Sequence, residues 1–123
     1  MKKVILDTNF ILACVNQKID FFEEIKFLGL KIIIPKPVIK ELEGIAKSDK
    51  KYHSKEDANI ALKLIETSKF EKTGLDMGSV DSGIIKAAKA DKELVLATLD
   101  RRINSLTRNP RLVIKGKKKL EIM

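Results

Sequence analysis

The sequence predicts an α/β protein with a mostly parallel central sheet, and three observations lead to that prediction. Short apolar runs rich in β-branched residues alternate along the chain with segments of helical periodicity. These runs lack the alternation of apolar and polar residues that marks a half-exposed strand, so we expect strands buried on both faces. The 123 residues, 44% of them hydrophobic, suffice for one domain over residues 1–123 with its own core.

The chain is expected to begin with a short strand that is followed by a capped helix. An apolar run over 4–6 is the first strand, and it ends at Asp7. Asp20 is the expected N-cap of a helix over 21–28, because aspartate is a preferred capping residue. Gly29 closes that helix, since glycine readily adopts the conformation that ends helices.

Two prolines separate the second strand from the next helix. The strand is expected over 31–34, and Pro35 and Pro37 stop it and occupy the opening turn of the helix that follows. The stretch over 47–57 is almost entirely polar and predicts a loop. Ser54 has the capping-box spacing to an acid and predicts the start of another helix.

The remaining segments continue the alternation of strands and helices. We expect, in order, an edge strand over 70–73, a helix over 79–90, a buried strand over 94–97, one or two helical turns over 101–107 and a last strand over 112–114. Ligands of open α/β proteins bind beyond the carboxyl ends of the strands, so that edge of the sheet is the expected functional site.

The charge balance points to an anionic partner. The 25 lysines and arginines exceed the 17 acids and give a net charge of +8, which favours nucleic acid over a membrane surface. A lysine-rich solvated surface is the simpler alternative. Cys14 lies in an apolar stretch, which predicts a buried thiol in a reducing compartment and a cytoplasmic protein. No apolar run approaches the roughly 20 residues that span a bilayer.

Four acids occupy positions that would bring them to one edge of the sheet. Asp7 and Asp100 each follow a buried strand. Asp81 precedes Ile84 on the apolar arc of its helix, so its carboxylate is expected to face inward. Glu41 lies at the border of the apolar stripe on the helix after the second strand, from where it reaches the same edge.

Each of these acids also has a simpler interpretation. Asp7 and Asp100 are acceptable helix N-caps, and Asp81 suits the first turn of a helix. Glu43 flanks the same apolar stripe as well as Glu41 does. Four carboxylates together, however, carry about −4 and cannot persist in a partly buried site without raised pKa values or a bound cation. Oxygen ligands suit Mg²⁺ or Mn²⁺, which predicts hydrolysis of a phosphodiester.

The order and spacing of four motifs resemble those of the PIN domain over nearly the whole chain. These motifs are DTNF at 7–10, VIKELE at 38–43, Asp81 followed by Ile84, and ATLDR at 97–101. The resemblance implies a three-layer α/β/α sandwich of the 5′-nuclease type. It also implies an endoribonuclease that depends on Mg²⁺ or Mn²⁺.

The resemblance also assigns roles to particular residues. It implies a catalytic and metal-binding quartet, in which it favours Glu41 over Glu43, and two hydroxyls that orient carboxylates or the attacking water. The quartet is Asp7, Glu41, Asp81 and Asp100, and the hydroxyls belong to Thr8 and Thr98. Ser82 and Leu99 depart from relatives that carry an acid and a polar residue there, so the number of metal ions stays open.

The motifs look closest to the archaeal and eukaryotic branch that trims small-subunit ribosomal RNA. A toxin ribonuclease similar to VapC, with an antitoxin as its partner, is the alternative within the family. Many PIN proteins form dimers, so the resemblance also implies a homodimer.

Basic residues near the expected site are candidates for contacts to RNA phosphates. They are Arg101, Arg102, Arg108 and Arg111. Few residues are available for base stacking, because the phenylalanines mostly fit a core.

Two other classes of function stay open. One is a non-catalytic RNA- or protein-binding module in a ribonucleoprotein. The other, a phosphatase or receiver-like domain with Asp7 as nucleophile, is disfavoured because Asn9 stands where a companion acid is expected.

Overall fold

The computed structural model describes residues 2–48, 53–73, 79–116 and 118–123. Each of the first four strands is followed by one or two helices, and the chain ends with two strands in succession. The elements are β1 (Lys3–Leu6), α1 (Thr8–Asn16), α2 (Phe21–Phe27), β2 (Lys31–Pro35), α3 (Lys36–Ala46), α4 (His53–Glu66), β3 (Glu71–Thr73), α5 (Val80–Ala90), β4 (Val95–Ala97), α6 (Arg101–Leu106), β5 (Leu112–Lys115) and β6 (Lys119–Ile122).

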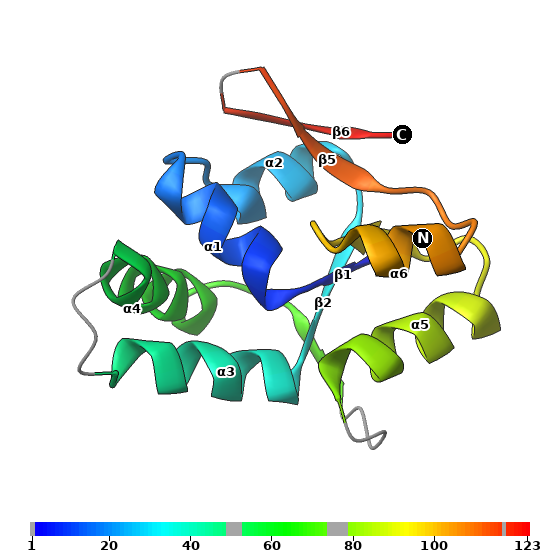
Figure 1. The fold of residues 1–123 in the computed structure, drawn as a ribbon. Coiled ribbons are helices and arrows are strands. Elements are labelled where there is room, and N and C mark those ends of the chain that lie inside the picture. The colour runs from blue at the N-terminus through cyan, green and yellow to red at the C-terminus, as the bar shows by residue number, and fades with distance from the viewer. Residues whose placement is uncertain (1, 49–52, 74–78, 117) are drawn as a thin grey trace.

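The central sheet has four parallel strands in the order β3-β2-β1-β4, which confirms the predicted fold class. Strand β1 is therefore in the middle of the sheet, with β2 and β4 on its two sides. Helices α1 to α4 pack on one face of the sheet, and α5 and α6 pack on the other (Figure 1). Because all four strands run in the same direction, their carboxyl ends lie at one edge.

Alternate residues of each strand point into two separate hydrophobic clusters, because successive side chains leave a strand on opposite faces. Val4 and Leu6 enter the larger cluster, together with Phe10 of α1 and Leu42 of α3. Ile5 enters the smaller cluster, which also contains residues of α5 and α6. This burial on both faces explains the unbroken apolar runs in the sequence.

The helix ends follow the capping residues that the sequence offers. The Asp20 carboxylate accepts a hydrogen bond from the Glu23 N–H at 3.2 Å, and Gly29 has a φ of +75° just past the end of α2. Helix α4 begins at His53, so the predicted loop over 47–57 is helical in its last part, and residues 49–52 lie outside the described part.

The C-terminal segment differs from the expectation of a single last strand before a lysine run. Strands β5 and β6 form an antiparallel hairpin in which Leu112 is paired with Ile122. Lys119, expected in a charged run, is the first residue of β6. The hairpin adjoins the central sheet where the Leu96 N–H donates to the carbonyl of Pro110 at 2.9 Å.

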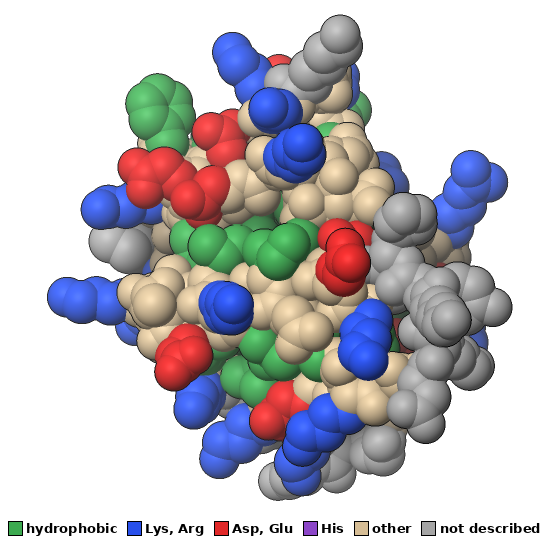
Figure 2. Space-filling model, turned by 90° about the vertical axis from the view of Figure 1, so that its left-hand side faces the viewer, with side chains coloured by type: hydrophobic (Ala, Val, Ile, Leu, Met, Phe, Trp, Pro, Cys, Tyr) green, Lys and Arg blue, Asp and Glu red, His purple; other side chains and the backbone are tan. Residues whose placement is uncertain are grey.

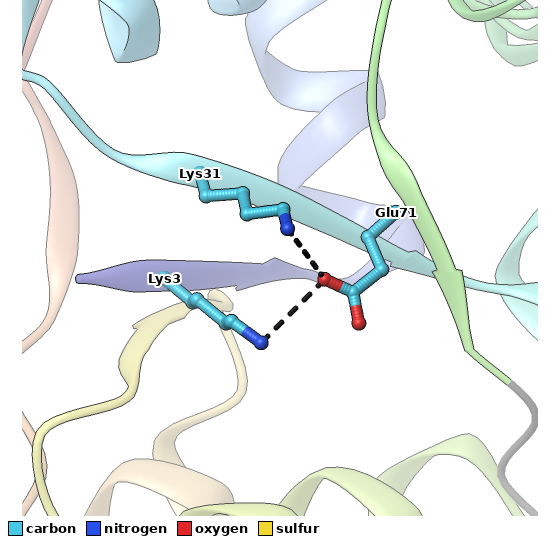
Figure 3. Close-up of polar contacts among 3 residues, drawn as sticks. All are labelled: Lys3, Lys31 and Glu71. Carbon is cyan, nitrogen blue, oxygen red and sulfur yellow. Dashed lines mark ion pairs between the residues drawn. The ribbon is translucent and has the colours of Figure 1, made fainter. Parts of the chain in front are cut away.

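Two ion pairs that share one carboxylate connect three strands at the opposite edge of the sheet, where the strands begin (Figure 3). The Glu71 carboxylate of β3 lies 3.5 Å from the ammonium of Lys3 on β1 and 3.4 Å from that of Lys31 on β2. All three side chains are partly exposed, so each contact contributes at most about 1 kcal/mol.

On the side of the molecule where α4 lies, the basic side chains of the described residues are not gathered into one patch (Figure 2). Hydrophobic side chains form a band across the middle of this face, with acidic and basic side chains interspersed around it (Figure 2). Among the helices of the described residues, none combines the length and apolar character needed to cross a membrane.

Candidate active site

Asp7 is held at the carboxyl edge of the sheet by both its backbone and its carboxylate. It follows β1 directly, and its N–H donates to the carbonyl of Ala97 at the end of β4 at 3.0 Å. Its Oδ1 accepts a hydrogen bond from the Thr8 N–H at 2.8 Å, and its Oδ2 accepts one from the Thr98 hydroxyl at 2.9 Å. The side chain is only 6% exposed, so its position is tightly defined.

Thr98 joins Asp7 to the motif at 97–101. Its hydroxyl donates to Asp7 and accepts a hydrogen bond from the Asp100 N–H at 3.1 Å. The Asp100 carboxylate accepts from the N–H groups of Arg102 and Ile103 at 2.8 and 3.4 Å, and it therefore caps α6. The capping interpretation of Asp100 is correct, and a capping carboxylate at this edge can also act on a ligand.

Glu41 is brought to the same site by Thr8. The Thr8 hydroxyl donates a hydrogen bond to Glu41 Oε1 at 2.8 Å, although 33 residues separate them in the chain. Thr8 is buried, whereas Glu41 on α3 is exposed. For Glu43, which is also exposed, no comparable contact to the site is found among the described residues.

Asp81 is near the site but does not face inward, so that part of the expectation is wrong. Its side chain is exposed, because it lies in the first turn of α5, while Ile84 one turn later is buried. Ser79 is the N-cap of α5, and its hydroxyl accepts from the Ser82 N–H at 3.1 Å and donates to the Ser82 hydroxyl at 2.9 Å. Ser82 therefore takes part in capping the helix.

Two of the other acids, Asp81 and Glu41, interact electrostatically with Asp7. Burial raises the pKa of the Asp7 carboxyl above its usual value, and the negative charges of Asp81 and Glu41 raise this pKa further. The hydrogen bonds from Thr98 and Thr8 oppose the rise, because they stabilise the carboxylate form. Asp7 is thus the buried centre of a site with an excess of negative charge.

The donor chemistry of this site fits a divalent cation. Its side-chain groups are oxygen donors, which Mg²⁺ and Mn²⁺ prefer, and a cation would offset the repulsion among the carboxylates. Within the described ranges, no three aspartate, glutamate, histidine or cysteine side chains are already gathered closely enough to hold an ion. The acids therefore surround Asp7 without converging on one point.

The predicted RNA-contacting arginines separate into two groups. Arg101 and Arg102 begin α6 directly after Asp100, at the carboxyl edge, and both are exposed. Arg108 and Arg111 are also exposed but follow the end of α6, and Arg111 forms a bridge to Leu96 within β4. The first pair is therefore better placed beside the acids.

Two further predictions concern Cys14 and the phenylalanines. Cys14 is a fully buried free cysteine, as expected, and burial raises the pKa of its thiol to about 12. Phe10 and Phe21 are buried as expected, but Phe27 is 90% exposed. The sequence offered a signal for this exposure, since Phe27 is the last residue of a short helix whose two earlier phenylalanines already face the core.

Comparison with known proteins agrees with this fold. The family model described as a PIN like domain matches residues 4–116. The chain is 34% identical to Ribonuclease VapC4 of Methanocaldococcus jannaschii in an alignment 129 positions long. The alignment covers 99% of this chain and 97% of that protein. Among solved structures, that of the PIN domain endonuclease Utp24 has a TM-score of 0.78 and 26% identity, covering 98% of this chain and 90% of that one.

The parallel sheet with acids at its carboxyl edge makes this an α/β protein with a candidate ligand site at that edge. The chain belongs to the PIN domain ribonuclease family, as its four motifs predicted.

Proposed function

We propose that this protein is a divalent-metal-dependent endoribonuclease that acts through Asp7, Glu41, Asp81 and Asp100. The observation that carries the proposal is the Asp7 carboxylate, which Thr98 and Thr8 hold in place and whose pKa is raised by its burial and further by the charges of Asp81 and Glu41. Such an arrangement costs folding free energy, and binding of a cation removes much of that cost. The two relatives, named as a ribonuclease and an endonuclease, support the same reaction.

Each residue of the site has a distinct part in the proposal. The four carboxylates would hold Mg²⁺ or Mn²⁺, which would supply polarisation of a phosphodiester and activation of water for hydrolysis. Thr98 fixes Asp7, and Thr8 fixes Glu41, so both threonines act as positioning residues. Arg101 and Arg102 bind RNA phosphates next to the acids, and Arg108 and Arg111 bind phosphates of the same RNA strand that lie farther from the acids.

The RNA substrate separates two versions of this function. The resemblance of the motifs to the branch that trims ribosomal RNA supports processing of ribosomal RNA precursors, and a similar solved structure is that of a PIN domain endonuclease. Similarity to Ribonuclease VapC4 over nearly its full length supports a toxin-type ribonuclease that an antitoxin partner inhibits. Induced expression in a host separates them, because a toxin arrests growth and its Asp7→Asn variant does not.

The remaining features of the proposal follow from composition and family. We infer a single domain over residues 1–123 that works in the cytoplasm, where Cys14 stays reduced, and that forms a homodimer. A non-catalytic binding module is the alternative function, and it predicts RNA binding without cleavage.

Cleavage of a labelled single-stranded RNA tests the proposal. We expect cleavage by the wild type with Mn²⁺ or Mg²⁺, none with a chelator, and none by Asp7→Asn. Asp20→Asn is the matched control, because asparagine still caps α2 and the position is remote from the four acids. RNA binding by the wild type without cleavage in either metal would instead establish the binding module.

A further inference from the structure

A cavity of about 590 Å³ lies at the opposite end of β2 from the acidic site. It is within the size range of roughly 300 to 1,000 Å³ that is common for small-ligand sites. Its apolar walls come from Phe22 of α2, from Leu30 and Ile32 at the start of β2, and from Phe70 just before β3. The cavity is therefore separate from the carboxyl edge where Asp7 and Thr98 lie.

Two aromatic rings of the wall suit a planar ligand. The ring centroids of Phe22 and Phe70 are 6.3 Å apart and their planes are inclined by 51°. Phe22 is 9% exposed and also contacts Phe21, so its ring is fixed by the core. Phe70 is only partly buried, so its ring offers a nucleobase more of a face for stacking than the ring of Phe22 does.

The charged residues around the cavity favour an anion. Lys26 and Lys69 line it, and Glu23 is the acidic residue among its lining residues. Lys31 also lines it, while the Lys31 ammonium lies against Glu71 beside Lys3 (Figure 3). Two lysines share one carboxylate there, so this group adds a further positive charge.

Phe27 extends the same surface into solvent. It follows Glu23 by four residues, which places both on one side of α2, and its side chain is 90% exposed. A phenylalanine exposed to this extent next to a cavity with aromatic walls and lysines is typical of surfaces that bind single-stranded nucleic acid.

We propose that this cavity, together with Phe27, binds a nucleotide: the base stacks on the phenylalanines and the phosphate contacts Lys26 and Lys69. The nucleotide is either a unit of the RNA strand or a free nucleoside phosphate. The proposal deepens the proposed function, because a strand bound here extends substrate recognition beyond the cleavage site. The cavity and the acids are separated by the length of β2, roughly 13 Å, which a few nucleotides of an extended strand cover.

Binding measured in a chelator tests this site without cleavage. The probes are a fluorescent single-stranded 12-nucleotide RNA, followed by anisotropy, and AMP and UMP, followed by amide shifts of Gly29, Leu30 and Ser68. The variants are Lys26→Glu, Lys69→Glu and Phe27→Ser, which alter exposed side chains and leave the core intact. Lys89→Glu on α5, across the sheet, is the matched control for the change in net charge.

We expect each cavity variant to weaken RNA binding about tenfold. Each lysine reversal should also reduce the steepness of the plot of log binding constant against log salt concentration by about 0.7, because one phosphate contact is lost. The Lys89→Glu control should stay close to the wild type. Shifts with AMP or UMP at an affinity equal to that of the RNA identify a free nucleotide as the ligand, whereas tight binding of the RNA alone identifies the strand.

Two results would overturn the nucleotide site. One is that the Lys26 and Lys69 variants bind RNA no more weakly than Lys89→Glu. The other is that Phe27→Ser leaves RNA binding unchanged but converts a dimer into a monomer in light scattering, since the surface then belongs to a second copy of the chain. Both results are independent of cleavage, so failure of the proposed activity and failure of this site are distinguishable.

Discussion

The hydroxyl of Thr98 donates a 2.9 Å hydrogen bond to the carboxylate of Asp7, although 91 residues separate the two in the chain. Both side chains are buried, at the ends of the neighbouring strands β4 and β1. The same hydroxyl accepts the Asp100 N–H, so one threonine sets the positions of two of the four acids.

Replacement of Thr98 by valine keeps the shape of the side chain and removes both hydrogen bonds. Because the hydroxyl lowers the pKa of Asp7, its loss raises that pKa further. We expect a drop in kcat/KM of about 10- to 100-fold, the cost of losing a group that orients a metal ligand. The acid limb of the pH–rate profile should move to higher pH. Thr98→Ser keeps the hydroxyl and should restore both quantities; an unshifted profile in Thr98→Val would contradict the positioning role.

Asp7→Asn should make the metal-free protein more stable while it abolishes cleavage. The folded-state pKa of Asp7 lies above its unfolded value of 3.8, so the folded state binds this proton more tightly. The stabilisation that this proton provides is complete below pH 3.8 and is lost as the pH rises through the folded-state pKa. At neutral pH the neutral asparagine avoids this loss, and we expect a rise in Tm of roughly 2 to 6 °C. Thermal unfolding of both proteins in a chelator at pH 4 and pH 7 checks this. A Tm difference between Asp7→Asn and the wild type that does not grow from pH 4 to pH 7 would contradict it.

Glu41→Gln separates the two glutamates that sequence periodicity alone cannot tell apart. Glutamine can still accept the hydrogen bond from Thr8, so the fold should persist, but the charge near Asp7 is gone. We expect cleavage to fall by at least the ~100-fold that the loss of an outer-shell partner can cost. Glu43→Gln, on the same helix and equally exposed, is the control and should cleave as the wild type does.

Two substitutions of Asp100 distinguish capping from catalysis. Asparagine caps a helix nearly as well as aspartate, whereas alanine loses the bonds to Arg102 and Ile103 at a cost of about 1 kcal/mol. Both variants should lose cleavage, and only Asp100→Ala should unfold at lower denaturant concentration. Full activity in Asp100→Asn would show that Asp100 serves the helix alone.

The parts of the fold that depend on local pattern were predictable from the sequence. The buried parallel strands appear as unbroken apolar runs, and Asp20, Gly29 and Pro35 mark element ends that the structure confirms. The positions of Asp7 and Asp100 at one edge follow from strand direction, because β1 and β4 are parallel. Asp7 follows the end of β1 directly, and Asp100 comes shortly after the end of β4.

Other features depend on contacts that a sequence pattern does not contain. Periodicity places Asp81 on the side of Ile84, but it does not show that Asp81 is exposed in the first turn of α5 while Ile84, in the next turn, is buried. The hairpin of β5 and β6 was missed because its lysines suggest a charged tail, whereas backbone pairing with Arg111 and Leu112 determines its structure. The hydrogen bonds of Thr8 to Glu41 and of Thr98 to Asp7 join distant segments, and only the family resemblance suggested them.

The position of β1 in the middle of the sheet has a consequence for the order in which the protein matures on the ribosome. Asp7 is synthesised early, but the strand whose Ala97 carbonyl anchors it and the hydroxyl that orients it are made 90 and 91 residues later. Until β4 has emerged, one side of β1 has no neighbour and the carboxylate is not held in place. A nascent chain is therefore expected to be unable to cut RNA, including the message being translated, until nearly all of these residues have left the ribosome.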